Sequence, residues 1–328
     1  MGPTLRPAHR LRHPSLMVFL RLASAVLAFF EPSLGASGAS ALTRAYIEDG
    51  RLEQAILFAH DRLRHFPLDP FLHYHAGRAA QKKGLSEQAV VRFAHAAALL
   101  PEDANCRFAL AFALREVGRL EAACAEYRQA LARSPDDPRI LFNLAVVERE
   151  RGHRDVAIEH LKRCLSRSSR DLRAAYTLGL CHYERGEWKD ARLAFEAVLR
   201  LDKGYAKAHY QLGAVALSEG DRLAAAVHLR RSLKLSGDYG PAHFALGKCL
   251  EDTEPSVALR HFEASVSPPG AVPAGHFERA RLLARLGQAG RAREALEAYV
   301  RAVPRAAGHG AVTELSTRLE RMSRPGHS

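Results

Sequence analysis

The chain has 328 residues, of which 47% are hydrophobic and 7% aromatic, and its formal net charge is +12. This composition is that of a soluble protein with closely packed helices, and the charge favours an acidic partner such as a peptide, a nucleic acid or an anionic membrane. Its odd number of cysteines, without a C-x-x-C pair, excludes a disulfide framework and a clustered zinc site and favours a reducing compartment. The cysteines fall in predicted helices as small core residues, at Cys106, Cys124, Cys164, Cys181 and Cys249.

Residues 1–40 precede the regular part of the chain as an N-terminal extension. They carry no acidic residue before Glu31, and their apolar run from Leu16 to Phe30 is interrupted by Arg21. A secretory signal, a mitochondrial presequence and an untargeted capping helix over the first repeat all fit this composition. The run is too short for a stable membrane span. We expect a cytoplasmic protein, with mitochondrial or secretory targeting by residues 1–35 left open.

From residue 41 to residue 304, the same residue types recur at an interval of about 34 residues. Small residues recur in the first half of each unit, at Gly77, Ala111, Ala145, Gly179, Gly213, Gly247 and Ala280. Glycines recur at the middle, at Gly50, Gly84, Gly118, Gly152, Gly186, Gly220 and Gly287. Alanines recur in the second half, at Ala55, Ala89, Ala123, Ala157, Ala191, Ala225, Ala258 and Ala292. Each unit therefore predicts two amphipathic helices joined by a tight turn.

The units differ along the chain. The entry unit, residues 41–67, is degenerate, and the following units are regular as far as residue 237. Large residues at matched places in their second helices are predicted to lie in the core, at Phe93, Tyr127, Leu161, Phe195 and Leu229. The unit that begins at Gly240 lacks its turn glycine, and the proline-rich stretch at residues 267–273 predicts a bend in an irregular region, 253–273. Residues 305–328 supply a capping helix, 311–322, and a disordered tail.

The recurring small residue, turn glycine and second-helix alanine, with prolines such as Pro101 and Pro135 closing several units, resemble the tetratricopeptide repeat. The resemblance covers residues 41–304. It implies an all-α fold, a right-handed α-solenoid of about eight stacked helix–turn–helix repeats in one elongated domain. It also implies a concave groove lined by the first helices.

If the resemblance holds, one position in each first helix faces this groove, and it is always aromatic. These residues are Tyr74, Phe108, Phe142, Tyr176, Tyr210, Phe244 and Phe277. Basic residues flank them, at Arg115, Arg139, Arg149, Arg173 and Lys207. Together they suit a protein ligand, an extended peptide or an amphipathic helix with apolar side chains and carboxylates. Two alternatives stay open, since the rings also suit packing between repeats and the arginines also suit ion pairs with Glu116, Glu150 and Glu184.

The leading hypothesis is therefore a non-catalytic scaffold for protein–protein interaction. A nucleic-acid-binding helical repeat protein and a regulatory subunit of an enzyme complex are the alternatives. The sequence His153-Arg154-Asp155 imitates a kinase catalytic loop but lacks the accompanying motifs. His209, His243 and His276 recur in consecutive repeats, which stand about 10 Å apart, too far to share one metal ion. No enzyme activity, cofactor or metal is expected, and the sequence does not address the oligomeric state.

Overall fold

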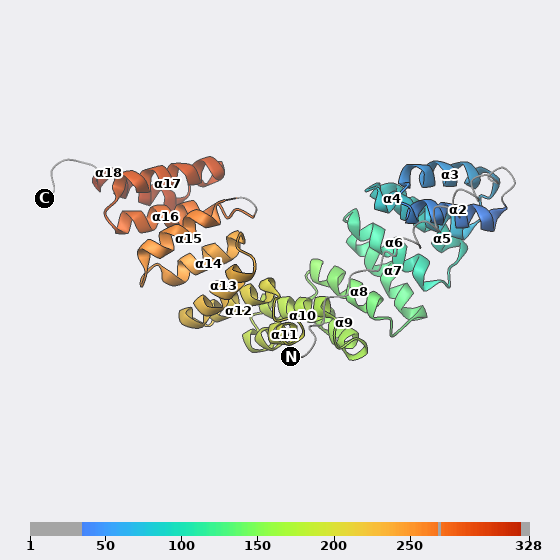
Figure 1. Cartoon of the computed structure of the whole chain (residues 1–328), viewed down its shortest axis with the longest axis horizontal. Helices are drawn as coiled ribbons and strands as arrows, with labels where there is room; N and C mark the ends of the chain where they lie inside the picture. Colours follow the sequence, from blue (N-terminus) through green and yellow to red (C-terminus); the bar gives the residue numbers. More distant parts are fainter. Residues whose placement is uncertain (1–34, 268–269, 323–328) are drawn as a thin grey trace, which may run out of the picture. The chain divides into compact units, whose positions relative to one another are not determined.

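The computed structural model describes residues 35–267 and 270–322 (Figure 1). Within these residues the chain forms 17 α-helices, one short 3-10 helix and no strand, which confirms the all-α fold. The described chain falls into two compact units, one ending at Ser169 and the other beginning at Arg170. The predicted targeting segment or capping helix within residues 1–34, and the tail after residue 322, lie outside the described residues.

Each unit contains four helical hairpins. The first unit comprises α2 (Ala36–Glu48), α3 (Leu52–His65), α4 (Pro70–Lys82), α5 (Ser86–Leu99), α6 (Ala104–Glu116), α7 (Leu120–Arg133), α8 (Pro138–Glu150) and α9 (Arg154–Arg167). The second comprises α10 (Leu172–Glu184), α11 (Trp188–Leu201), α12 (Ala206–Ser218), α13 (Arg222–Leu235), α14 (Gly240–Leu250), α15 (Pro255–Ser265), α16 (Ala274–Arg285) and α17 (Ala289–Ala302), followed by η2 (Pro304–Ala306) and α18 (Gly310–Met322). The described residues thus form eight helical hairpins, and α2 begins before the expected boundary at residue 41.

Aspartates start several of the first helices. The side chain of Asp69 accepts a hydrogen bond from the backbone N–H of Leu72 at 2.8 Å, and Asp103 accepts one from Cys106 at 2.9 Å. Such caps satisfy N–H groups that the first turn of a helix leaves unpaired. Asp137 and Asp171 occupy the same place in the next two repeats.

Glycine makes the turn inside each regular hairpin because the backbone there is left-handed. The seven predicted turn glycines have φ between +75° and +85°, a region where a Cβ atom would be strained. A different requirement applies at Gly179 in α10. A Cβ atom there would lie 2.5 Å from the ring of Phe195 in α11, so only glycine admits this ring.

The core follows the predicted pattern. All eight recurring second-helix alanines are fully buried, as are the large second-helix residues Phe93, Tyr127, Leu161, Phe195 and Leu229. The five cysteines are all buried, as expected. At the C-terminus, α18 buries Val312, Leu315 and Leu319 against the last hairpin. None of the described helices has the length and apolar character to cross a membrane.

The irregular hairpin lies where the sequence loses its turn glycine. Its helices α14 and α15 have 11 residues each, whereas the longest helices in the other hairpins of the second unit have 14 residues. The linker between α15 and α16 folds back, since the backbone N–H of Val272 donates to the carbonyl of Ser265 at 2.7 Å. A Cβ atom at Gly240 would overlap the carbonyl of Gly270, so the linker packs closely on the start of α14.

Candidate partner-binding surface

Side chains one repeat apart meet between neighbouring first helices. Gln81 in α4 donates to Glu116 in α6 at 2.9 Å, and Gln211 in α12 donates to the hydroxyl of Tyr176 in α10 at 3.2 Å. Arg115 in α6 pairs with a carboxylate in α8 in the same way. We call the surface that the first helices of a unit share its first-helix face. It is formed by α4, α6 and α8 in the first unit and, separately, by α10, α12, α14 and α16 in the second.

The predicted aromatic residues lie on this face and are all half-buried. Five of the rings pack against an aromatic ring of the second helix in their own hairpin. Ring centroids are 5.6 Å apart in three such pairs, Tyr74–Phe93, Phe108–Tyr127 and Tyr176–Phe195. In the second unit the rings also touch the next repeat, with 5.5 Å between Tyr176 and Tyr205 and 5.0 Å between Tyr210 and Tyr239. The aromatic series therefore packs, and its remaining exposed area is what a partner could contact.

Most of the predicted basic residues already have partners inside the chain. The Nε atom of Arg115 donates to Glu150 at 3.0 Å. Arg139 pairs with Asp137 at 2.7 Å, and its guanidinium lies 5.6 Å from the ring of Phe108. Arg173 lies 3.5 Å from Asp171, and Arg149 also interacts within the protein. Lys207 is exposed and has no ion pair in the described parts of the chain. The structure thus contains ion pairs within the chain, which the sequence analysis kept as an alternative to binding a ligand carboxylate.

A hollow of about 410 Å³ opens on the first-helix face of the second unit. Two predicted aromatics, Tyr210 and Phe244, line it together with Tyr183, Leu217 and Val272. Burial raises the pKa of Tyr210 to about 12, so its hydroxyl stays protonated at neutral pH and can donate a hydrogen bond.

Tyr183, Leu217 and Val272 are among the lining residues that were not predicted from the sequence. Tyr183 lies seven residues after Tyr176, and Leu217 lies seven after Tyr210, so both share a helical face with the predicted aromatics. That spacing was available in the sequence. Val272 comes from the linker after α15, and no periodic signal points to it.

The first unit has a second hollow of about 710 Å³ between α2 and α4. Its lining includes Ser40, Arg44, Phe71 and His75. Phe71 is 58% exposed, which is high for a phenylalanine, and it occupies the place that Arg139 takes two repeats later. Burial, with smaller effects from nearby arginines, lowers the pKa of His75 to about 4, so this part of the face carries a neutral imidazole at pH 7.

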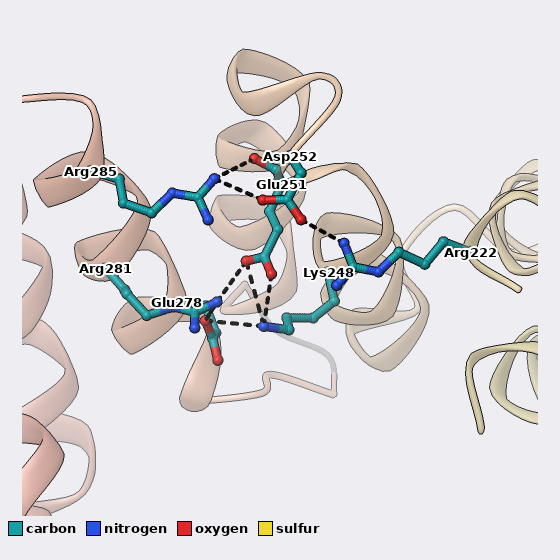
Figure 2. A network of polar contacts seen from close by, with 7 residues as sticks. All are labelled: Arg222, Lys248, Glu251, Asp252, Glu278, Arg281 and Arg285. Carbon is teal, nitrogen blue, oxygen red and sulfur yellow. Dashed lines mark hydrogen bonds and ion pairs between the residues drawn. The ribbon is translucent and has the colours of Figure 1, made fainter. Parts of the chain in front are cut away.

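An ion-pair network braces the irregular hairpin (Figure 2). One of its members, Lys248, also lines the hollow of about 410 Å³. The Glu251 side chain is only 7% exposed and lies 3.2 Å from Lys248 and 2.7 Å from Arg281. Asp252 pairs with Arg222 at 2.6 Å and Arg285 at 3.0 Å, and both hydrogen bonds lower its pKa. Figure 2 shows these acidic residues lying between basic residues of neighbouring repeats.

This network gives a physical reason for the lost turn. Glu251 and Asp252 follow the last residue of α14, where the helix dipole disfavours negative charge. The surrounding basic residues compensate, and Glu278 completes the network by pairing with Lys248 at 3.4 Å. The hairpin therefore closes with cross-repeat ion pairs in place of a glycine turn.

A buried cluster in the first unit brings together residue types that catalyse reactions elsewhere. Glu148 is fully buried and accepts from Cys124 at 2.9 Å, Arg128 at 2.7 Å and His153 at 2.9 Å. Burial alone would raise the pKa of Glu148, but these hydrogen bonds and the nearby arginines, Arg151 included, outweigh it and lower the pKa. Burial raises the pKa of Cys124 to about 11, so the thiol is a donor and not a thiolate nucleophile. His153, the residue that imitated a kinase motif, belongs to this structural cluster.

Within the described residues, one group of three side chains has ligand atoms close enough to suggest a metal site. The ligand atoms of His182, Glu187 and Asp190 lie within 4.8 Å of one another. The Nδ1 atom of His182 is 2.5 Å from Glu187, whose other oxygen pairs with Arg185 at 2.9 Å. An arginine on the same carboxylate disfavours a bound cation, so we interpret the group as a polar closure of the turn.

The geometry defines an all-α protein built of stacked helical hairpins. Two family models for the tetratricopeptide repeat match the chain, over residues 104–147 and 142–206. The chain is a tetratricopeptide repeat protein. No curated protein matches it.

Three solved structures illustrate the likeness of fold. The pilF protein of Pseudomonas aeruginosa is 20% identical over 65% of this chain and 96% of its own, with a TM-score of 0.56. A tetratricopeptide repeat protein of Parabacteroides merdae is 15% identical over 70% of this chain and 91% of its own, with a TM-score of 0.58. The Cut9–Hcn1 hetero-tetramer of APC/C contains a chain that is 15% identical, with 93% of this chain and 59% of that one covered and a TM-score of 0.57.

Proposed function

We propose that this protein is a non-catalytic scaffold that holds a segment of a partner protein, an extended peptide or an amphipathic helix, on its first-helix face. The observation that carries the proposal is the hollow of about 410 Å³ lined by Tyr183, Tyr210 and Phe244. A flat aromatic lining offers contact area at little cost in side-chain entropy, and the tyrosines add hydrogen-bonding groups. Among proteins of similar fold, the Cut9–Hcn1 assembly provides an analogy for a role in a complex.

The chemistry of the hollow defines the segment that we propose it binds. A bulky apolar side chain would enter between the rings of Tyr183, Tyr210 and Phe244. A carboxylate on the same segment would pair with Lys207, which lies one turn before Tyr210 on α12 and has no ion pair within the described residues. An acidic and apolar segment therefore fits best.

The intramolecular ion pairs do not prevent such binding. Arg173 is 69% exposed and lies 3.5 Å from Asp171. Exposed pairs of this kind contribute about 0–1 kcal/mol, so a ligand carboxylate can replace the internal one at little cost. Arg139 is similarly exposed and pairs with Asp137. We therefore keep both arginines in the proposed binding surface with Tyr74, Phe108, Phe142, Tyr176, Arg115 and Arg149.

A substitution that fills the hollow tests the proposal without removing packed side chains. Ala214 lines the hollow, and Val227 is 65% exposed on the second helix α13. We expect Ala214→Arg to abolish capture of the partner from native cell extract, while the matched control Val227→Arg leaves it unchanged. Both variants should keep the wild-type circular dichroism spectrum. Equal capture by wild type and Ala214→Arg would exclude the hollow as the binding site.

The same experiment separates the nucleic-acid alternative. Cross-repeat pairs such as Arg115–Glu150 and Arg119–Glu87 neutralise cations that a phosphate backbone would need. We expect capture to survive nuclease treatment, and we expect only weak binding of random oligonucleotides at low salt. Loss of capture after nuclease treatment, with a steep salt dependence, would favour nucleic-acid binding instead. A regulatory subunit of an enzyme complex would use the first-helix face in the same way.

A further inference from the structure

Two pairs of histidines each join the first and second helix of one hairpin, and neither pair connects different repeats. In the hairpin of α14 and α15, the Nδ1 atoms of His243 and His261 lie 2.9 Å apart, with ring centroids 5.2 Å apart. In the preceding hairpin, the Nδ1 atoms of His209 and His228 lie 3.5 Å apart. The distance between repeats that excludes a shared metal ion therefore does not apply to these pairs.

A backbone carbonyl fixes the tautomer of His243. Its Nε2 atom lies 3.0 Å from the carbonyl oxygen of Gly237, which can only accept a hydrogen bond. When the imidazole is neutral, the proton must therefore be on Nε2, and Nδ1 directs its lone pair at His261. Without a metal, His261 donates its Nδ1–H to this lone pair.

We propose that His243 and His261 form a two-imidazole site for a divalent late transition-metal ion, Cu²⁺ or Ni²⁺, bound through both Nδ1 atoms. Two nitrogens at about 2.0 Å from a metal and at right angles to each other are about 2.8 Å apart, whereas tetrahedral ligands at the same distance are about 3.3 Å apart. The observed 2.9 Å fits adjacent corners of a square-planar or tetragonal ion. The carbonyl on the far nitrogen of His243 is the usual outer partner of a metal-binding histidine.

Metal binding at this pair needs no net release of protons. His261 moves its proton from Nδ1 to Nε2, and the metal replaces the N–H···N hydrogen bond. Both side chains are half-buried, so water can fill the remaining coordination positions. With two protein ligands, the expected affinity is modest, and Cu²⁺ should bind more tightly than Ni²⁺.

Some charged residues around the pair favour metal binding and others oppose it. Burial, then His243, Arg230 and Arg260, lower the pKa of His261 to about 4, so the ring is neutral and available at pH 7. The two arginines repel a dication, while Glu254 attracts it. Arg230 is 3.3 Å from Glu254, which reduces its repulsion.

A third histidine pair supplies an internal control. In the first unit, His73 and His95 stack with ring centroids 4.9 Å apart, and no hydrogen-bond partner for the Nδ1 atom of His73 exists within the described residues. In the repeat of this pair, Arg92 occupies the position that corresponds to His261. His95 lies one helical turn after Arg92. This pair stacks its rings instead of converging its nitrogens, so it is not a chelating site.

Electron paramagnetic resonance of the full chain with Cu²⁺ tests the site. At one equivalent and pH 7, we expect a signal with hyperfine coupling to two nitrogens. His261→Gln and His243→Gln should each remove one nitrogen and weaken binding at least tenfold, as judged by competition with a colorimetric chelator. His95→Gln should leave signal and affinity unchanged.

Several results would overturn the proposal. A two-nitrogen signal of equal affinity in His261→Gln and His243→Gln would place the metal elsewhere, as would its loss in His95→Gln. Absence of any two-nitrogen signal in the wild-type chain would exclude the site outright. Because two separate ligands are replaced and each variant is checked by circular dichroism, a folding defect in one does not mask the result. None of these readouts depends on the partner-binding hollow.

Discussion

The buried carboxylate of Glu148 accepts a hydrogen bond from His153 at 2.9 Å, and the next repeat holds the same two places with acid and base exchanged. There His182 is the buried residue and Glu187 its partner, at 2.5 Å. In both hairpins the contact joins the last turn of the first helix to the residue at the N-cap position of the second helix. These two neighbouring repeats therefore close with the same kind of polar contact, with the acid on opposite sides of it.

Replacing the buried acid should expose its role in stability. We expect Glu148→Gln to lower the free energy of unfolding by about 1–3 kcal/mol, because Arg151, 19% exposed, would lose the charge that compensates it. Urea denaturation followed by circular dichroism measures the change. Glu121 is the matched control, since it is 81% exposed and 3.6 Å from the same arginine, and Glu121→Gln should change stability by less than about 0.5 kcal/mol. Equal losses in the two variants would contradict the assigned role.

The buried histidines make stability depend on pH below neutrality. His75 has a pKa of about 4 in the folded chain, below the value of about 6.5 expected after unfolding. Between these pH values the unfolded chain binds more protons than the folded chain. The contribution of His75 to the free energy of unfolding is therefore full above about pH 6.5 and falls as the pH drops toward about 4. Allowing for partial exposure, we expect a loss of about 1–2 kcal/mol. The difference between the urea midpoints at pH 7 and pH 5 should become smaller in His75→Gln, but not vanish, because His261 also has a lowered pKa. It should stay unchanged in His60→Gln, which alters an exposed histidine.

The sequence predicted the hairpins well because their determinants are local and repeated. Gly179 opposite Phe195 and the left-handed Gly186 each require glycine for a steric reason that the interval of the repeat exposes. The ion pairs could not be predicted in the same way. Arg115 had Glu116 beside it in sequence but pairs with Glu150 one repeat later, because long side chains choose partners by three-dimensional distance.

The candidate surface was predicted only in part. Tyr210 and Phe244 occupy one helical position that repeats through the chain, and both line a hollow. Their contact with a partner stays a prediction. Val272 enters the same hollow from a linker without periodicity, so only the folded chain brings it there. His261 was missed as the partner of His243 because the comparison was made between repeats, whereas the contact is made within a hairpin.

Gly179 and Phe195 form a small-to-large pair that can be exchanged as a unit. We expect Gly179→Ala to destabilise the protein by about 1–3 kcal/mol, because its Cβ would lie 2.5 Å from the ring of Phe195. The preceding repeat places Ala145 and Leu161, both fully buried, at the matched positions. The double variant Gly179→Ala with Phe195→Leu copies that combination and should recover part of the loss in a double-mutant cycle. A double variant less stable than the sum of the single changes would show that the two positions do not complement each other.

The network in Figure 2 contains two neighbouring acids whose environments differ, and this difference predicts different costs of neutralisation. Glu251 is 7% exposed between Lys248 and Arg281, whereas Asp252 is 51% exposed. Glu251→Gln should cost about 1–3 kcal/mol, since it leaves partly buried cations without their carboxylate. Asp252→Asn should cost clearly less than Glu251→Gln, because solvent screens its pairs. Adding 1 M salt should reduce the smaller effect more than the larger one, as exposed charges are screened first. If both variants lose the same stability at low and high salt, burial does not govern this network.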